Sequence, residues 1–156
     1  MPNWCEGFLK VRGTIPQLKK FIIEGFQLVD IFGNELENLS IDCNDGTSLE
    51  VSGINETLWL KGTHRNFCKF DDIGIYSDSP ETSEVLILYL QAAWCIETEP
   101  LLNVCKKFEV DMKIQGFESG MQFSQIIEIV DGKILQDEII HYDNWDWDCP
   151  CPLMGG

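Results

Sequence analysis

The chain begins with an alternation of apolar and polar residues that is typical of a half-buried β-strand. Over residues 4–12, Cys5, Leu9 and Val11 fall on one face, and charged residues fall on the other. Phe8 is the aromatic residue on this charged face. The pattern therefore predicts a strand that packs on a core with one side only.

A helix should follow this strand. Thr14 and Gln17 have the spacing of a capping box, and Pro16 fits the first turn of a helix. Apolar residues then recur at helical spacing and form one face of the helix. They are Ile15, Leu18, Phe21, Ile22 and Phe26.

The second half of the chain contains the most apolar segment. Residues 85–94 are apolar on both faces, which is typical of a central strand covered on both sides. Trp94 ends this strand, so we expect its side chain to be buried. Thr98 should then cap a second helix over residues 99–108.

The last part of the ordered pattern predicts three strands, at residues 109–117, 121–130 and 133–142. Asp131-Gly132 has the composition of a two-residue hairpin turn between the last two. Residues 144–156 follow as an irregular acidic tail.

The middle of the chain has a weaker pattern. Residues 27–47 and 71–84 are predicted to be loop-rich insertions, the first with one short strand at Leu39 to Cys43 and a hairpin turn at Asp45-Gly46. Two further strands are predicted at residues 48–52 and 57–62.

The order of these elements predicts an α+β fold of the ferredoxin-like βαββαβ type. We expect a mainly antiparallel sheet with two helices on one face, an insertion after the first helix and a C-terminal β-hairpin. Residues 1–143 would form this single domain, which suits the usual domain size of about 100–150 residues.

Two parts of the sequence carry a family resemblance. Met1-Pro2-Asn3-Trp4-Cys5, running straight into a strand, resembles the start of the YubB/Api-type ferredoxin-like domain family. Residues 85–130 add Trp94, the helix ending at Phe108 and the run 118–123, whereas residues 27–84 and the tail match poorly. The resemblance implies a ferredoxin-like sheet in a small bacterial, plasmid or phage protein. The family has no established activity, cofactor or catalytic residues that the resemblance would imply.

The charge of the chain bears on its partners. The sequence holds 26 acidic and 11 basic residues, for a net charge of −15. Such a surface repels nucleic-acid phosphates, so we expect no direct binding to DNA or RNA. Residues 137–148 contain five acids and no base. Asp143, Asp146 and Asp148 are therefore candidates for an interaction surface that meets a basic patch on a partner protein, although a solvated acidic surface explains them as well.

An aromatic stacking platform for RNA is the alternative that this charge disfavours. Ferredoxin-like sheets can present aromatic residues to bases, and the chain has candidates in Trp4, Phe8, Trp59, Trp94, Phe108, Phe117 and Phe123. Such platforms also need a basic groove, which the sequence does not supply.

Metal binding and catalysis have weak candidates. His141, Cys149 and Cys151 could ligate a soft metal ion, but Cys-x-Cys lacks the two-residue gap of zinc knuckles. No hydrolase, metalloprotease or P-loop motif occurs, and we expect no cofactor. The leading hypothesis is a non-enzymatic protein-binding module that presents its sheet or its acidic tail. The alternative is a small enzyme or metal-dependent module built from His64, His141 and the tail cysteines.

The expected compartment is the cytoplasm. The first residues lack the basic start and apolar run of a secretory signal, and no apolar run reaches the ~20 residues of a membrane span. The seven cysteines are scattered, as expected for reduced thiols.

Overall fold

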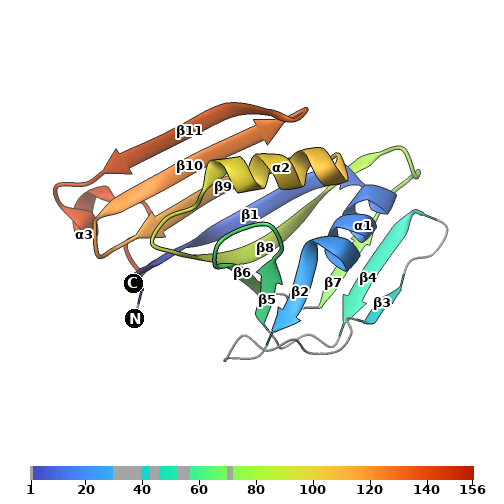
Figure 1. Cartoon of the computed structure of the whole chain (residues 1–156), viewed down its shortest axis with the longest axis horizontal. Coiled ribbons are helices and arrows are strands. Elements are labelled where there is room, and N and C mark those ends of the chain that lie inside the picture. The colour runs from blue at the N-terminus through green and yellow to red at the C-terminus, as the bar shows by residue number, and fades with distance from the viewer. Residues whose placement is uncertain (1, 30–39, 43–45, 53–56, 70–71) are drawn as a thin grey trace.

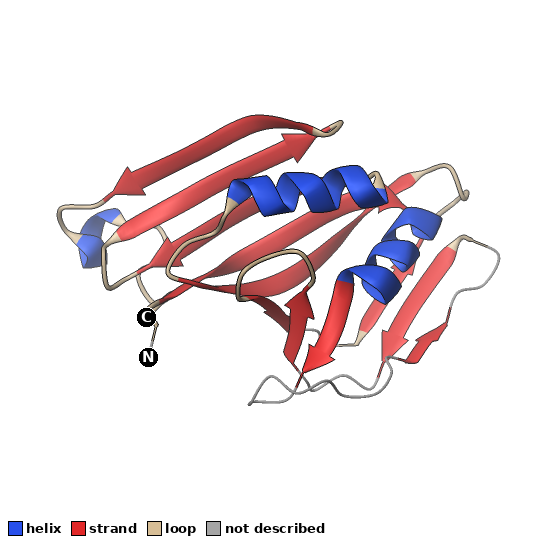
Figure 2. Cartoon of the chain, in the orientation of Figure 1, coloured by secondary structure: helices blue, strands red, loops and turns tan. Residues whose placement is uncertain are grey.

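The computed structural model describes residues 2–29, 40–42, 46–52, 57–69 and 72–156. They form an eight-stranded sheet, a separate three-stranded sheet and three helices (Figures 1 and 2). The strands of the large sheet are β1 (Trp4–Thr14), β2 (Phe26–Val29), β5 (Thr57–Leu60), β6 (Asn66–Lys69), β8 (Ser83–Ala93), β9 (Asp111–Glu118), β10 (Phe123–Val130) and β11 (Lys133–His141). Those of the small sheet are β3 (Ser40–Asp42), β4 (Ser48–Ser52) and β7 (Ile73–Tyr76). The helices are α1 (Ile15–Gly25), α2 (Thr98–Phe108) and α3 (Trp145–Asp148).

The prediction of a ferredoxin-like βαββαβ sandwich is wrong. The large sheet has the order β11-β10-β9-β1-β8-β6-β5-β2, all paired antiparallel, and the small sheet has the order β3-β4-β7. Strand β3 confirms the short strand predicted at Leu39 to Cys43, whereas β2, which runs into residues 27–47, and β7, within residues 71–84, lie in segments predicted to be loop-rich. Strands of three or four residues are too short to show a periodicity of their own. Asp45 of the predicted Asp45-Gly46 turn lies outside the described residues.

Helix α1 forms as its sequence predicts. The Thr14 hydroxyl accepts from the Gln17 backbone N–H, and the Gln17 side chain accepts from the Thr14 N–H at 2.8 Å, which confirms the capping box. Its buried face packs on the sheet through Phe21. This ring meets Phe26 edge-on at 5.0 Å and Phe108 of α2 at 5.6 Å.

Helix α2 forms in the predicted place, but its start differs. The N-cap residue is Glu97, and the Thr98 hydroxyl donates to Asp137 of β11 at 2.6 Å instead of capping the helix. Glu109 ends the helix in the left-handed conformation. The Thr98–Asp137 bond thus ties the helix start to a strand at the edge of the sheet.

The hydrophobic core lies between the large sheet and the two long helices. Figure 1 shows α1 and α2 on the same side of the sheet, with the small sheet next to α1. Leu9 and Val11 of β1 lie opposite Leu88 and Leu86 of β8, and all four are buried under the helices. Leu49 and Val51 of β4 join the same core.

Over its centre, the other side of the large sheet has no element of the described residues packed on it. Because side chains alternate along a strand, Phe8 and Tyr89 lie opposite each other on the far side from Leu9 and Leu88. Val85 and Ile87 point the same way and are 48% and 55% exposed. The prediction that this strand is covered on both sides is therefore wrong. We call this side of the large sheet the open face.

The C-terminal segment packs on one end of the molecule. Trp145 of α3 and Cys149 form a second buried cluster with Phe117 of β9. Trp4 and Gly156 exchange backbone hydrogen bonds of 3.2 and 3.1 Å, so the two ends of the chain lie side by side (Figure 1). Residues 144–156, predicted to be an irregular tail, thus include a short helix and a buried tryptophan.

None of the helices in the described ranges has the length and apolar character that crossing a membrane requires.

Candidate functional site

Apolar side chains gather at the centre of the open face. Phe8 is 50% exposed, and its ring meets Tyr89 edge-on at a centroid distance of 5.9 Å. Ile87 and Val85 precede Tyr89 in β8 by two and four residues, so their side chains lie on the same face as Tyr89. An exposed cluster of this kind marks an interaction surface more often than a free surface.

The sequence of β8 strengthens this interpretation. A strand that is apolar on both faces normally has a layer on each side, because leaving an isoleucine or phenylalanine in water forgoes about 1.5–3 kcal/mol. Leu86, Leu88 and Leu90 have such a layer in the helices. Val85 and Ile87 have the composition of core residues without a described layer over them.

The open face is electrically balanced, unlike the protein as a whole. Residues directly opposite each other in neighbouring strands share a face, so the pairing of the strands assigns charges to it. Its bases are Lys10, Arg12, Lys69, Lys113 and Lys133, and its acids are Glu6, Asp111, Glu128 and Glu138, so the two signs differ by one charge. The protein as a whole carries −15, so the remaining surface holds the excess of acids. An apolar partner surface therefore meets little net charge on the open face.

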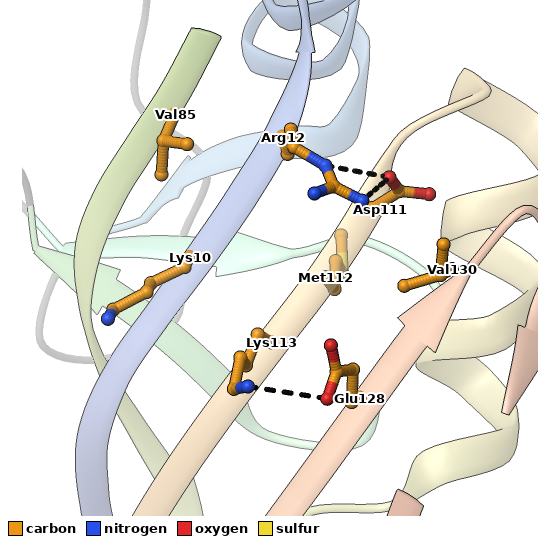
Figure 3. A pocket seen from close by; sticks show the side chains of 8 residues that line it. All are labelled: Lys10, Arg12, Val85, Asp111, Met112, Lys113, Glu128 and Val130. Carbon is orange, nitrogen blue, oxygen red and sulfur yellow. Dashed lines mark hydrogen bonds and ion pairs between the residues drawn. The ribbon is translucent and has the colours of Figure 1, made fainter. Parts of the chain in front are cut away.

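A hollow of about 140 Å³ lies on this face between β1, β9 and β10 (Figure 3). Arg12 donates to Asp111 at 2.6 and 2.9 Å, and Lys113 contacts Glu128 at 3.3 Å. Small-molecule sites usually measure about 300–1,000 Å³. The hollow is therefore smaller than a substrate pocket, and its polar groups already bind one another.

Glu6 forms the polar end of the open face. Its carboxylate accepts hydrogen bonds from Gln91 and from the Gly155 backbone N–H at 3.2 Å. Partial burial acts to raise the pKa of Glu6, but hydrogen bonds from Gln91, Tyr89 and Gly155 outweigh it and hold the pKa below its ordinary value. Burial, and then the bond to Glu6, raise the pKa of Tyr89. Glu6 thus stays charged and orients its neighbours.

The predicted acidic interaction residues lie at one end of the open face. Asp143, Asp146 and Asp148 are all exposed. Asp146 and Asp148 belong to α3, which packs on Phe117 through Trp145. Phe117 lies opposite Glu6, so α3 sits over the open face at that end. The acidic side chains therefore border the apolar centre at one end.

The metal candidates do not converge. His141 ends β11, where it is exposed and meets Phe123 edge-on at 6.0 Å. Cys149 is buried beside Trp145 and Phe117, and Cys151 is half-buried against the same cluster. Within the described ranges, no three His, Cys, Asp or Glu side chains form a group that could hold a metal ion.

The two histidines of the enzyme hypothesis lie far apart. His64 follows β5, next to one edge strand, and His141 belongs to β11, the opposite edge strand. With neighbouring strands about 4.8 Å apart, the six spacings between β5 and β11 put them roughly 29 Å apart. His64 and His141 therefore cannot act on one substrate atom.

Five of the cysteines that the structure describes are not activated nucleophiles. Burial raises the pKa of the Cys5 and Cys105 thiols to about 12, and it also raises the pKa of Cys68, Cys95 and Cys149. A thiol with a raised pKa stays protonated at neutral pH and reacts poorly.

A second hollow, of about 470 Å³, lies where α2 ends beside β9 and the turn between β10 and β11. Its lining includes Gln17, Asp111 and Asp131. Gln17 serves the cap of α1, and Asp111 accepts from Arg12 and from the Asp131 N–H at 2.9 Å. These polar groups therefore hold elements together.

The sequence missed the importance of Trp94. Its side chain is 56% exposed, so the prediction that it is buried is wrong. Its backbone is in the left-handed region at φ 72°, where large side chains are rare. The Trp94 N–H donates to Asn3 at 2.9 Å, which holds this turn against the start of β1. No periodicity signals this reversal.

No protein-family model, curated protein or solved structure significantly matches this chain. The resemblance to the YubB/Api-type family therefore stays a prediction.

Proposed function

We propose that this protein is a non-enzymatic module that binds another protein through the open face of its large sheet. The observation that carries the proposal is the exposure of Phe8, Val85 and Ile87 on central strands whose sequences have the composition of a core. A partner that covers them would supply the second layer for which the sequence of β8 is suited.

The partner should present an apolar patch flanked by basic residues. The apolar patch would cover Ile87 and Phe8, and the basic residues would meet Asp143, Asp146 and Asp148 at the end of the open face. Opposite charges mainly raise the rate of association. Neutralising the three aspartates together should therefore slow association and weaken its dependence on salt, while the fold stays intact.

The arrangement of polar groups favours binding over catalysis. The histidines of the enzyme hypothesis lie near opposite edges of the sheet, and the acids of the open face are engaged with neighbouring bases or amides. We also propose that the protein does not bind nucleic acid directly, because each phosphate contact needs a cation and the net charge is −15.

Affinity purification from the organism that carries the gene tests the proposal, if it is run with two variants in parallel. Val85→Lys with Ile87→Lys puts two charges into the apolar centre, and these exposed positions should tolerate them. The matched control is Ile23→Lys on α1, whose side chain is 49% exposed. Partners identified by mass should include one that the control retains and the double variant loses.

Two results would refute the proposal. One is a partner that the wild type, the double variant and the control retain equally, because that partner binds elsewhere. The other is tight binding of single-stranded RNA or DNA by the purified wild-type protein near physiological salt. That result would favour the aromatic platform of Phe8, Tyr89 and Trp4.

A further inference from the structure

Strand β11 forms an edge of the large sheet and has one side without a described partner. Among the described residues it pairs with β10 alone, through a register that is regular from Gln136 to His141. The backbone N–H and C=O groups of alternate residues therefore point outward, away from the sheet. Figure 1 shows this strand along the margin of the molecule, away from α1 and the small sheet.

This edge lacks most of the features that protect edge strands from pairing. Natural edges are blocked by proline, by lysine within the strand or by bulges. β11 has no proline, its one lysine is Lys133 at its start, and its bulge lies near that same end. Leu135 and Ile139 are 62% and 52% exposed. The stretch from Gln136 to His141 is therefore free to accept another strand.

The charge of the edge selects the kind of strand. Asp137 and Glu138 lie in the middle of β11 and are exposed, and Asp143 follows the strand. A second copy centred on this part of the edge would bring these acids face to face, which destabilises strand pairs. A strand with lysine or arginine at these positions would gain from the same charges.

We propose that β11 binds an extended basic segment of a partner protein as an additional strand of the large sheet. Asp137 and Ile139 lie on the helix side of the sheet, because they pair with Ile127 and Gln125, whereas Glu138 lies on the open face. The segment therefore places a basic residue next to Asp137, an apolar residue next to Ile139, and a second basic residue next to Glu138 on the other side. This strand addition uses a surface other than the apolar centre of the open face and does not depend on it.

The first test uses a synthetic nine-residue peptide with blocked ends that repeats Val-Lys-Lys three times, so that in one antiparallel register Lys residues lie next to Asp137 and Glu138 and Val lies next to Ile139. It should bind the full chain in fluorescence anisotropy and slow amide hydrogen exchange in residues 133–141. The same peptide with Glu in place of every Lys, and the Lys/Val peptide with all its backbone amides N-methylated, should bind at least tenfold more weakly. The methylated peptide keeps its charge but cannot donate ladder hydrogen bonds.

The second test uses variants of the protein. Glu138→Lys with Ile139→Lys should weaken binding of the Lys/Val peptide at least tenfold. The matched control is Ile23→Lys with Glu24→Lys, which makes the same changes on α1, where Ile23 is 49% exposed. This control should bind the peptide as the wild type does, and urea titration of both variants verifies that they fold.

Four results would overturn the proposal. They are the absence of peptide binding, equal binding by the N-methylated peptide, protection from exchange outside β11, and an equal loss of binding in the control variant. Sedimentation of the free protein gives a fifth: a dimer that Ile139→Lys converts to monomer would make a second copy the occupant.

Discussion

Neighbouring residues of β1 provide the sharpest test of the open face. Leu9 is fully buried under the helices, whereas Phe8, the residue before it, is 50% exposed on the other side. Replacing each by alanine compares the two faces of one strand at almost the same place in the chain. The larger side chain should have the smaller effect on stability if the open face is uncovered.

The expected magnitudes follow from burial. Leu9→Ala removes a fully buried side chain from the core, which costs about 2–5 kcal/mol. Phe8→Ala forgoes roughly half of the burial of a phenylalanine and one edge-on contact with Tyr89, and we expect about 1–2 kcal/mol. For a chain of this size each 1 kcal/mol shifts the melting temperature by about 2–4 °C.

The assay is urea unfolding followed by tryptophan fluorescence, at two protein concentrations. Leu9→Ala should lower the unfolding midpoint clearly more than Phe8→Ala, with the same dependence on urea. A Phe8→Ala loss as large as that of Leu9→Ala would show that Phe8 is buried in solution. If that loss also grew with protein concentration, a second copy would cover the open face, and the proposed function would be wrong.

Three further predictions concern other positions. Trp94→Gly should leave the protein as stable or raise its stability by about 1 kcal/mol, because glycine accepts φ 72° without strain; a loss above about 2 kcal/mol in urea titration would show that the indole packs on the body. Gln125→Leu should cost about 2–4 kcal/mol, since it leaves unpaired the Ile96 N–H and C=O that Gln125 binds at 3.0 and 2.8 Å; an unchanged urea midpoint would contradict the bonds. Glu6→Gln should destabilise the protein at neutral pH and less in acid, because a lowered pKa gives stability that is full above the ordinary pKa of 4.5 and is lost as the pH falls through the folded value. An equal effect in urea titrations at both pH values would rule out a contribution from its charge.

The sequence determined the local elements of this protein. The capping box of Thr14 and Gln17, the alternation along β1 and the Asp131-Gly132 turn were all predicted, and the structure confirms them. Each depends on residues a few positions apart, so its physical cause lies within the segment that forms it. The same holds for Asp143, Asp146 and Asp148, whose exposure follows from their charge.

Tertiary structure alone decided the size of the sheets and the place of the candidate site. The short strands β2 and β7 gain their stability from partners distant in the chain, so their own residues carry little signal. The apolar sequence of β8 indicates that both of its faces favour burial. It does not indicate that the described part of the chain covers only one of these faces. Trp94 was expected inside because it ends that strand, yet a backbone reversal held by Asn3 leaves it exposed. Which residues share a face or lie on opposite edges depends on strand order, and strand order is set by long-range pairing.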